Sequence, residues 1–315
     1  MMTLYNGLAL LAGTAHPPLA KAISEILEQP LCSAEVGRFP DGEVNVKLSE
    51  DVRGKDVFIL QPTCPPVNEN LVELLTLIDC CKRSSVGRIT AVMPYFGYAR
   101  KDRKDEGRVP ITAKLVADLL TVAGVDRVIA MDLHAPQIQG FFNVPVDHLY
   151  AKPVFRERFA GFDRENTTIV APDAGGIKMA RAYSSMLGMN FAIVDKRRMG
   201  PAEVVSENLI GHVDGQDVIL VDDMVATAGT IVDASRMVRA HGAKKVWIAA
   251  THGVFAGPAL ERLAGADLEG VIVTDTVCPQ SEYPDVIETL SVAPLLAETI
   301  HRIHVCRSVS SLFLD

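Results

Sequence analysis

The stretch "DVILVDDMVATAGTIVDASRMV", residues 217–238, predicts a strand, a loop and a helix in succession. Residues 218–221 are all apolar and mostly β-branched, which is typical of a buried strand in a parallel sheet. Asp222 and Asp223 follow at the carboxyl end of that strand. Beyond Thr230 the apolar residues recur at helical spacing, so we expect a helix whose inner face carries Ile231, Ala234, Met237 and Val238.

The loop between this strand and helix has the composition of an anion-binding turn. Thr227 and Thr230 supply hydroxyl donors, Gly229 lets the backbone approach a ligand closely, and the start of a helix offers unpaired N–H groups. Because carboxylates repel a phosphate, we expect Asp222 and Asp223 to contact sugar hydroxyls or a metal ion instead. The alternative is an ordinary helix N-cap beside a solvated acidic turn.

Length and composition indicate a globular protein of two domains. The 315 residues suit two domains of ordinary size, and 48% hydrophobic with 22% charged residues provides a full core. The net charge of −8 argues against general nucleic-acid or membrane-surface binding. The amino-terminal residues lack the basic segment of a signal peptide, so we expect a cytoplasmic location. The six cysteines show no C-x-x-C spacing, which predicts reduced, mostly buried thiols.

Strands and helices alternate along the whole chain, which predicts an α/β fold of mostly parallel sheets. Helices are expected between the strands, for example over 17–29, 68–84 and 111–124. The predicted strands are 8–12, 57–61, 89–93, 128–131, 168–171, 191–195, 218–221, 246–250 and 270–274.

A faint internal repeat indicates two similar domains in tandem. Residues 53–61, "RGKDVFILQ", resemble residues 214–222, "DGQDVILVD". We expect an N-terminal domain over 1–150 and a C-terminal domain over 151–315. Chance similarity between buried strands is the alternative.

A second marked stretch, "MPYFGYARKDRKDEGRVPIT" at 93–112, also follows a predicted strand. It places several cations together, and its prolines and glycines favour a loop. Such a loop suits a nucleotide polyphosphate, because cations meet phosphates and an arginine plane stacks on a base. A solvated charged turn is the alternative.

Three further strand ends carry polar residues. Asp132 and His134 in "MDLHAPQIQGFF" have the two-residue spacing that points side chains the same way in a strand, and they could bind a divalent metal. A structural histidine is the alternative. Asp173 precedes a tight turn in "PDAGG" and is a further candidate metal ligand. The consecutive cations of "DKRR", residues 195–198, follow another strand and suit a mobile flap over phosphates, or else a solvated basic loop.

Together these motifs resemble those of the ribose-phosphate pyrophosphokinase family over nearly the whole chain. The set comprises "GRFPDGEVNV", "PYFGYARKDRK", "MDLHAPQIQGFF", "PDAGG", "DKRR" and "VILVDDMVATAGT", in that order. The last of these is similar to the sugar-phosphate loop of type I phosphoribosyltransferases. The resemblance implies two tandem type I phosphoribosyltransferase-like domains, each a mostly parallel sheet flanked by helices. It also implies a homo-oligomer, a hexamer in this family.

The resemblance implies a role for each matching residue. The reaction would transfer the diphosphoryl group of Mg-ATP to the C1 hydroxyl of ribose 5-phosphate, with Mg²⁺ as the cofactor. The expected ATP-binding residues are Phe39, Asp41, Gly42 and Glu43, which would serve ATP from a neighbouring subunit, together with Arg100 and Lys101. The expected ribose 5-phosphate-binding residues are Asp222, Asp223, Ala226, Thr227, Ala228, Gly229 and Thr230. The expected metal ligands are His134 and Asp173, with Asp132 as a further candidate, and the expected catalytic residues are Lys196 and Arg198.

Two positions depart from the family pattern, and two other functions remain open. Ala226 stands where family loops commonly carry an acid, and Lys101 where a glutamine is frequent. A phosphoribosyltransferase is one alternative, although it would leave the ATP-type loop and the tandem domain unexplained. A non-catalytic, nucleotide-binding homologue is the other, although such proteins tend to lose the flap or metal residues that this chain keeps.

Overall fold

The computed structural model describes residues 5–198 and 205–313, with the backbone alone given for 196–198 and 205–207. Its contacts divide the chain into two units. Unit 1 comprises residues 1–150, 276–278 and 291–315, and unit 2 comprises 151–275 and 279–290. The last helix therefore belongs to unit 1, whereas the sequence suggested one continuous domain over 151–315.

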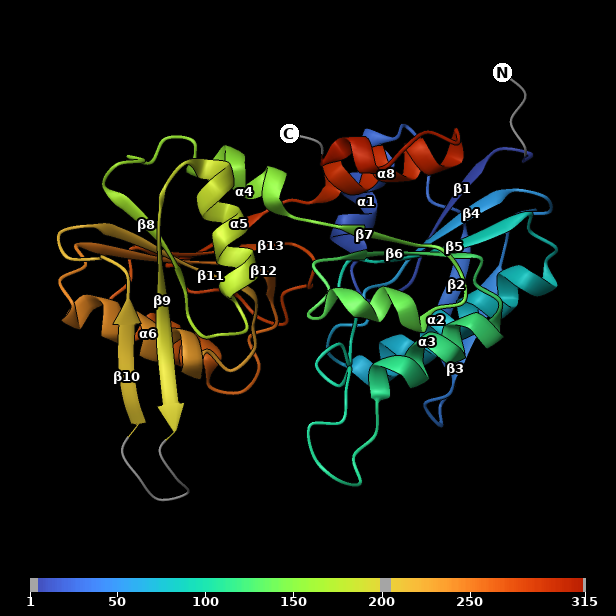
Figure 1. Cartoon of the computed structure of the whole chain (residues 1–315). Helices are drawn as coiled ribbons and strands as arrows, with labels where there is room; N and C mark the ends of the chain where they lie inside the picture. Colours follow the sequence, from blue (N-terminus) through green and yellow to red (C-terminus); the bar gives the residue numbers. More distant parts are fainter. Residues whose placement is uncertain (1–4, 199–204, 314–315) are drawn as a thin grey trace. The chain divides into compact units, whose positions relative to one another are not determined.

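Unit 1 is built on a five-stranded parallel sheet in the order β1-β4-β5-β6-β7, with β2 and β3 as a separate antiparallel hairpin. Helices α1 and α8 contact each other on one face of the sheet, and α2 and α3 contact each other on the other face (Figure 1). The elements are β1 (Leu8–Ala12), α1 (Pro17–Ile26), β2 (Ala34–Arg38), β3 (Val44–Leu48), β4 (Asp56–Leu60), α2 (Val67–Arg83), β5 (Arg88–Met93), α3 (Thr112–Ala123), β6 (Arg127–Met131), the 3-10 helix η1 (Pro136–Phe141), β7 (Val146–Leu149), α8 (Ala293–His304) and η2 (Ser310–Leu312).

Unit 2 is built on a seven-stranded sheet in the order β10-β9-β8-β11-β12-β13-β14, parallel except for the β9–β10 pair. The chain moves one way from β8 to β9 and the other way from β11 to β12, so right-handed crossovers put α5 and α6 on opposite faces (Figure 1). The elements are α4 (Lys152–Phe159), β8 (Thr167–Ala171), α5 (Ile177–Leu187), β9 (Asn190–Arg198), β10 (Val205–Ile210), β11 (Asp217–Val225), α6 (Gly229–Ala240), β12 (Lys245–Gly253), α7 (Ala259–Ala264), β13 (Gly270–Thr274) and β14 (Ile287–Leu290).

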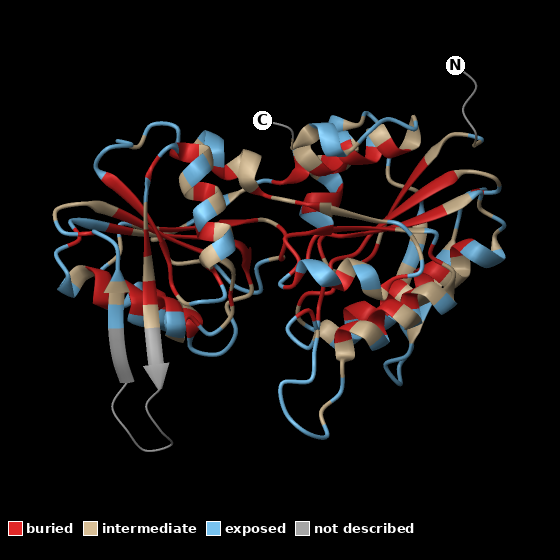
Figure 2. Ribbon diagram, viewed as in Figure 1, coloured by how far each residue is buried: buried red, intermediate tan, exposed pale blue. Residues whose placement is uncertain are grey.

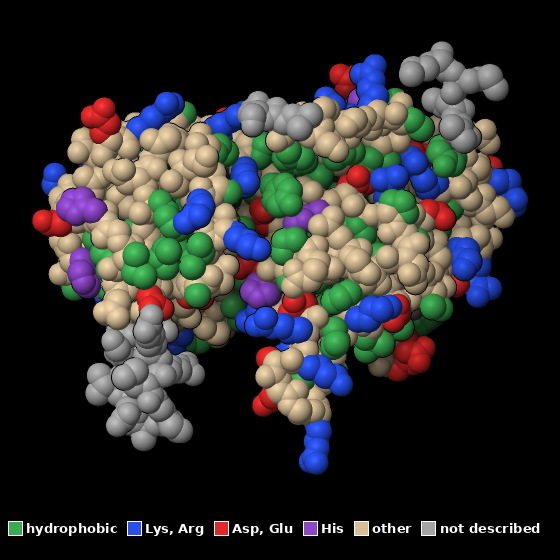
Figure 3. All heavy atoms as spheres, in the orientation of Figure 1, with side chains coloured by type: hydrophobic (Ala, Val, Ile, Leu, Met, Phe, Trp, Pro, Cys, Tyr) green, Lys and Arg blue, Asp and Glu red, His purple; other side chains and the backbone are tan. Residues whose placement is uncertain are grey.

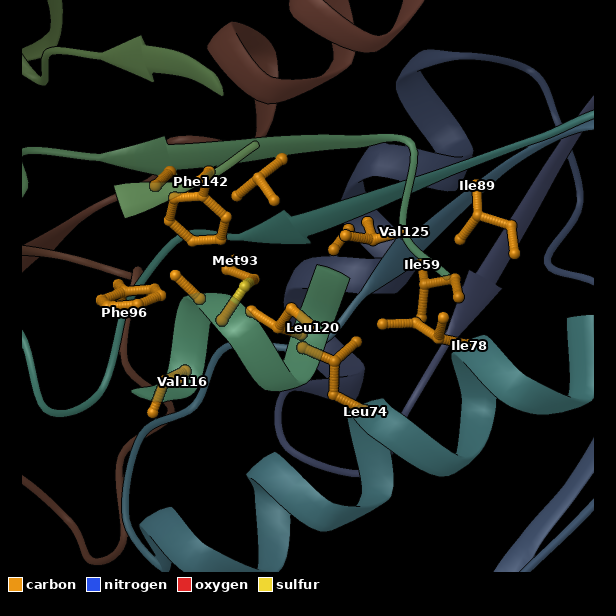
Figure 4. Close-up of a cluster of buried hydrophobic side chains, with 14 of the residues drawn as sticks. Ile59, Leu74, Ile78, Ile89, Met93, Phe96, Val116, Leu120, Val125 and Phe142 are labelled. Atoms are coloured by element: carbon orange, nitrogen blue, oxygen red, sulfur yellow. The ribbon is translucent and has the colours of Figure 1, made fainter. Parts of the chain in front are cut away.

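Hydrophobic burial follows the predicted pattern. The central strands are buried along their length, as β4 and β8 illustrate, while the helices bury one side only (Figure 2). In unit 1, side chains from the sheet and from α2 and α3 meet in one core, where Leu74 and Leu120 pack toward Ile59 and Met93 (Figure 4). In α6 the expected inner face is buried, as the periodicity predicted. Within the described residues no helix is long and apolar enough to span a bilayer.

All the predicted strands form. The structure also contains strands that the sequence pattern did not predict. These are the hairpin strands β2 and β3 and the edge strands β7, β10 and β14, which mix apolar with polar residues and are partly exposed. β9 was predicted to end at Asp195, but it continues to Arg198, because β10 pairs with it and aligns Glu207 with Lys196. The "DKRR" cations therefore lie on a β-hairpin rather than in a loop. Hydrogen bonds between backbones hold that hairpin, so the hydrophobic pattern does not reveal it.

A buried acid ties the C-terminal helix to the sheet of unit 1. Asp56, fully buried at the start of β4, accepts hydrogen bonds from Arg88 Nε at 2.8 Å and Nη2 at 2.6 Å. His304 Nδ1 of α8 lies 2.9 Å from Asp56 Oδ2, and Arg88 also donates to the carbonyl of Ile303 at 3.1 Å. Both oxygens of the carboxylate are thus engaged, and the pair joins segments far apart in the sequence.

We expect Asp56→Asn to lower the free energy of unfolding by about 3–5 kcal/mol, because it leaves the mostly buried Arg88 guanidinium without its counter-charge. The measurement is urea denaturation followed by circular dichroism. Asp79→Asn is the matched control, since Asp79 pairs with Arg83 at 2.7 Å on the surface, where such a pair contributes about 1 kcal/mol or less. Equal losses in the two variants would contradict the assignment.

Candidate functional site

Strand β11 extends beyond one of its neighbours and presents two carboxylates there. Its pairing with β8 ends at Leu220, whereas its pairing with β12 continues to Val225. Asp222 and Asp223 therefore lie within the strand. The sequence had suggested that they follow its end. They occupy the part of β11 that β8 no longer covers.

The carboxylate of Asp222 lies in an unfavourable electrostatic environment. Burial raises its pKa well above the usual value, and the nearby carboxylates of Asp223 and Asp173 raise it further. A hydrogen bond from the N–H of Asp223, at 2.9 Å, offsets only part of this effect. Asp173 itself follows β8, where its Oδ1 accepts the N–H groups of Gly175 at 2.8 Å and Gly176 at 3.1 Å. The structure thus brings Asp173, Asp222 and Asp223 together.

The loop after β11 is held by its carbonyl groups. The carbonyl of Val225 accepts N–H groups from Val254 and Phe255, and the carbonyl of Ala226 accepts the N–H of Ala256 at 2.8 Å. Helix α6 begins at Gly229, earlier than predicted, with Ala228 as its N-cap in the left-handed region at φ +60°. Gly229 and Thr230 therefore belong to the first turn of α6, where backbone N–H groups have no partner within the helix.

In unit 1, the predicted ATP-binding residues 39–43 form the turn of the β2–β3 hairpin. The N–H of Phe39 donates to the carbonyl of Glu43, and the N–H of Glu43 donates to Asp41 Oδ1. Gly42 has φ +95°, a value that glycine adopts easily. The Phe39 side chain is 48% exposed, which leaves its ring accessible.

A buried glutamate holds this hairpin against the core. Glu73 of α2 is fully buried, and its Oε2 accepts a hydrogen bond from Arg38 Nη1 at 2.8 Å. Its oxygens also accept bonds from the N–H of Thr14 and from Gln61 Nε2. The sequence did not identify Glu73 as functional, although a charged residue among the apolar positions of a helix could have signalled it. Arg38 and Glu73 fix the strand that leads directly to Phe39.

The loop between β5 and α3 carries the expected Arg100 and Lys101. Both are exposed, and Figure 3 shows the loop projecting from unit 1 with basic and acidic side chains on it. The prediction of a loop is confirmed. Lys101 Nζ pairs with Asp105 at 3.5 Å, while Gln137 Nε2 donates to Asp102 Oδ2 at 2.9 Å. That second bond joins this loop to the segment that carries His134.

Asp132 and His134 follow the end of β6 and differ in exposure, so the strand-like alternation expected of them does not apply. β6 ends at Met131, and Asp132 turns the chain with φ +35°. Asp132 is consequently buried while His134 is exposed. His148 of β7 holds this turn, because its Nε2 accepts the N–H of Leu133 at 2.9 Å. The alternation of side chains holds within a strand and fails where the backbone leaves it.

The predicted metal ligands are divided between the units: Asp132 and His134 lie in unit 1, and Asp173 lies in unit 2. Over residues 5–198 and 205–313, no group of three or more potential ligands has the arrangement of a metal site. The side chains of the expected catalytic residues Lys196 and Arg198 lie outside the described residues. Their backbone belongs to β9, beyond Ile193, where the pairing of that strand with β8 ends, and it pairs there with β10.

The architecture is that of the type I phosphoribosyltransferase-like proteins, with a loop between the central parallel strand β11 and helix α6. Residues 8–124 match the model of the N-terminal domain of ribose phosphate pyrophosphokinase, and residues 197–314 match that of the phosphoribosyl synthetase-associated domain. The ribose-phosphate pyrophosphokinase of Rhodopirellula baltica is 56% identical over 98% of this chain and 99% of its own length. That of Helicobacter pylori strain 26695 is 50% identical over 98% and 96%.

A solved structure agrees with these sequence matches. The phosphoribosylpyrophosphate synthetase of Mycobacterium smegmatis superposes with a TM-score of 0.91 at 42% identity, covering 96% of this chain and 100% of the other. The chain belongs to the ribose-phosphate pyrophosphokinase family. The resemblance found in the sequence and the predicted fold are therefore confirmed.

We expect Asp222→Asn to raise the melting temperature near neutral pH, because it removes a carboxylate that folding destabilises. A raised folded-state pKa means that the folded protein binds more protons than the unfolded chain between the two pKa values, so the wild type loses stability as pH rises through that interval. The gain from Asp222→Asn should shrink toward zero as pH falls below the ordinary aspartate pKa. Thermal denaturation across a pH series measures it, and a gain independent of pH would contradict the explanation.

Proposed function

We propose that this chain transfers the diphosphoryl group of ATP to the C1 hydroxyl of ribose 5-phosphate, giving 5-phosphoribosyl 1-diphosphate and AMP. The observation that carries the proposal is the 56% identity to a ribose-phosphate pyrophosphokinase over nearly the whole of both chains. A match of that extent spans both units, whereas a simple phosphoribosyltransferase would match only one. The product would supply activated ribose phosphate to nucleotide biosynthesis.

On the sugar side, residues 226–230 would bind the 5-phosphate, and Asp222 and Asp223 would bind the ribose hydroxyls. The first turn of α6 favours an anion through its N–H groups and the helix dipole. The side chains of Thr227 and Thr230 are exposed and can add hydroxyl donors. Ala226 lacks the acid common in the family, but its carbonyl is fixed by Ala256 and its N–H does not depend on the side chain. The departure therefore removes a side-chain contact and leaves the backbone of the loop in place.

On the nucleotide side, the hairpin residues Phe39, Asp41, Gly42 and Glu43 would serve ATP from a neighbouring subunit, and Arg100 and Lys101 would also contact ATP. The exposed ring of Phe39 is suited to stack on adenine, and its position depends on the Arg38–Glu73 pair. The arginine and lysine are suited to the phosphates. A lysine at position 101 adds a charge where a family glutamine would add a hydrogen bond.

We assign Mg²⁺ to His134 and Asp173, with Asp132 as a further ligand, acting on the phosphates of ATP. Carboxylate and imidazole groups are suitable donors, and the mutual repulsion of Asp173, Asp222 and Asp223 favours a cation near them. When bound, the ion would neutralise charge on the phosphoryl oxygens. The chain's own contribution is to orient the ribose through Asp222 and Asp223 and to supply cations from the β9–β10 hairpin.

We further propose a homo-oligomer, a hexamer by family resemblance, in the cytoplasm. Helix α3 exposes Leu115, Leu119 and Val122 by 55%, 40% and 79% on successive turns of one side. Exposed apolar residues grouped in this way are typical of an interface between proteins. A second copy of the chain is the partner that the resemblance implies.

The test of the function is to incubate the purified protein with ATP, magnesium and ribose 5-phosphate and to quantify AMP and the diphosphate sugar. Stoichiometric formation of both is expected. A protein that binds ATP and yields no AMP would instead be a regulatory, nucleotide-binding homologue. One that makes no AMP but consumes the diphosphate sugar with a nucleobase would be a phosphoribosyltransferase.

We expect Lys196→Ala to lower turnover by at least two orders of magnitude, about 3 kcal/mol of transition-state stabilisation, with a smaller effect on the affinity for ribose 5-phosphate. The reason is that a hairpin cation would act mainly on charge that develops during transfer. Steady-state kinetics with each substrate varied in turn measure the two effects. Retention of most of the turnover would count against a catalytic role for Lys196.

A further inference from the structure

An arginine outside every motif discussed so far contacts the sugar-phosphate loop. Arg262 of α7 donates from Nη1 to the carbonyl of Thr227 at 2.9 Å. The same nitrogen would lie 3.3 Å from a Cβ atom added to Gly229, so the guanidinium stands beside the start of α6. A positive charge beside a helix N-terminus is unfavourable by itself, because the helix dipole is positive there. An anion bound at that end of the helix would make the electrostatic energy of the guanidinium favourable there.

Packing holds Arg262 in this place. Ala259 and Leu263 of α7 are fully buried, and the N–H of Arg262 donates to the carbonyl of Pro258 at 3.0 Å. The short helix therefore presents one exposed position, residue 262, toward the loop after β11. Its hydrogen bond there is to a backbone carbonyl and not to a carboxylate.

The carbonyl bonds determine which way the loop directs its N–H groups. The carbonyls of Val225, Ala226 and Thr227 are all engaged by the segment between β12 and the end of α7, the last of them by Arg262. In a trans peptide the following N–H points opposite to the carbonyl. The N–H groups of Thr227 and Ala228 are consequently directed away from that segment. Ala228, in the left-handed region, then leads into the first turn of α6, an arrangement typical of a backbone anion site.

We infer that Arg262 is a positioning residue for the 5-phosphate of ribose 5-phosphate. It holds the Thr227 carbonyl, which orients the N–H of Ala228 toward the anion, and it adds positive charge at the N-terminus of α6. This inference rests on the proposed function, because it takes the ligand of the loop to be a sugar phosphate.

The test compares Arg262→Gln and Arg262→Lys with Arg236→Gln, which removes an exposed arginine of α6 that pairs only within its own helix in the described contacts. Ribose 5-phosphate binding is measured by isothermal titration calorimetry, and the KM values for ribose 5-phosphate and ATP by steady-state kinetics. We expect Arg262→Gln to weaken ribose 5-phosphate binding and raise its KM by about 10-fold, the effect of losing one charge-assisted hydrogen bond. The KM for ATP should change by less than about 2-fold. Arg262→Lys should be intermediate, and Arg236→Gln should match the wild type.

The outcomes separate this inference from the proposed function. If Arg262→Gln binds ribose 5-phosphate as tightly as the wild type does and has the same turnover, the role of Arg262 is overturned and the proposed function stands. A wild type that makes no AMP yet binds ribose 5-phosphate overturns the function, and calorimetry on the variants still decides the inference. Equal rises in the KM values for both substrates, or a lower melting temperature without recovery in Arg262→Lys, would indicate a structural role and overturn the inference.

Discussion

The candidate site depends on unequal pairing of one strand. β11 keeps β12 as a neighbour to Val225 but loses β8 after Leu220. That inequality leaves Asp222 and Asp223 in extended backbone at an open edge, close to Asp173 at the end of β8. It also lets the segment after β12 bind the carbonyls of the following loop. Strand pairing thus sets both the position of the acidic residues and the direction of the N–H groups in the following loop.

Asp56, Glu73 and the partly buried Asp222 have surroundings of two kinds. Asp56 and Glu73 are fully buried, and each has an arginine partner and further hydrogen bonds, so each joins distant segments of unit 1. Asp222 instead faces other carboxylates. Burial of like charges costs free energy unless a ligand compensates, and such unfavourable groups concentrate at functional sites. The electrostatic surroundings of Asp222 therefore differ in kind from those of the two structural acids.

The candidate ATP-side loops of unit 1 depend on residues that bind no substrate in the proposed mechanism. Arg38 and Glu73 fix the hairpin, Gln137 joins the basic loop to the turn after β6, and His148 holds that turn through Leu133. Arg262 has the corresponding place in unit 2. Loops at strand ends carry few apolar contacts of their own, so hydrogen bonds from neighbouring elements give them a defined conformation.

The sequence by itself determined the α/β fold, the buried strands and the family, because hydrophobic period and local motifs are properties of neighbouring residues. The extension of β9 and β11, the hairpin of β2 and β3, and the different exposure of Asp132 and His134 were decided by the tertiary structure. Backbone pairing between distant segments determines where a polar strand ends. The pattern of its side chains therefore does not predict that end. The same holds for Glu73 and Arg262, whose partners are distant in sequence and become neighbours only on folding.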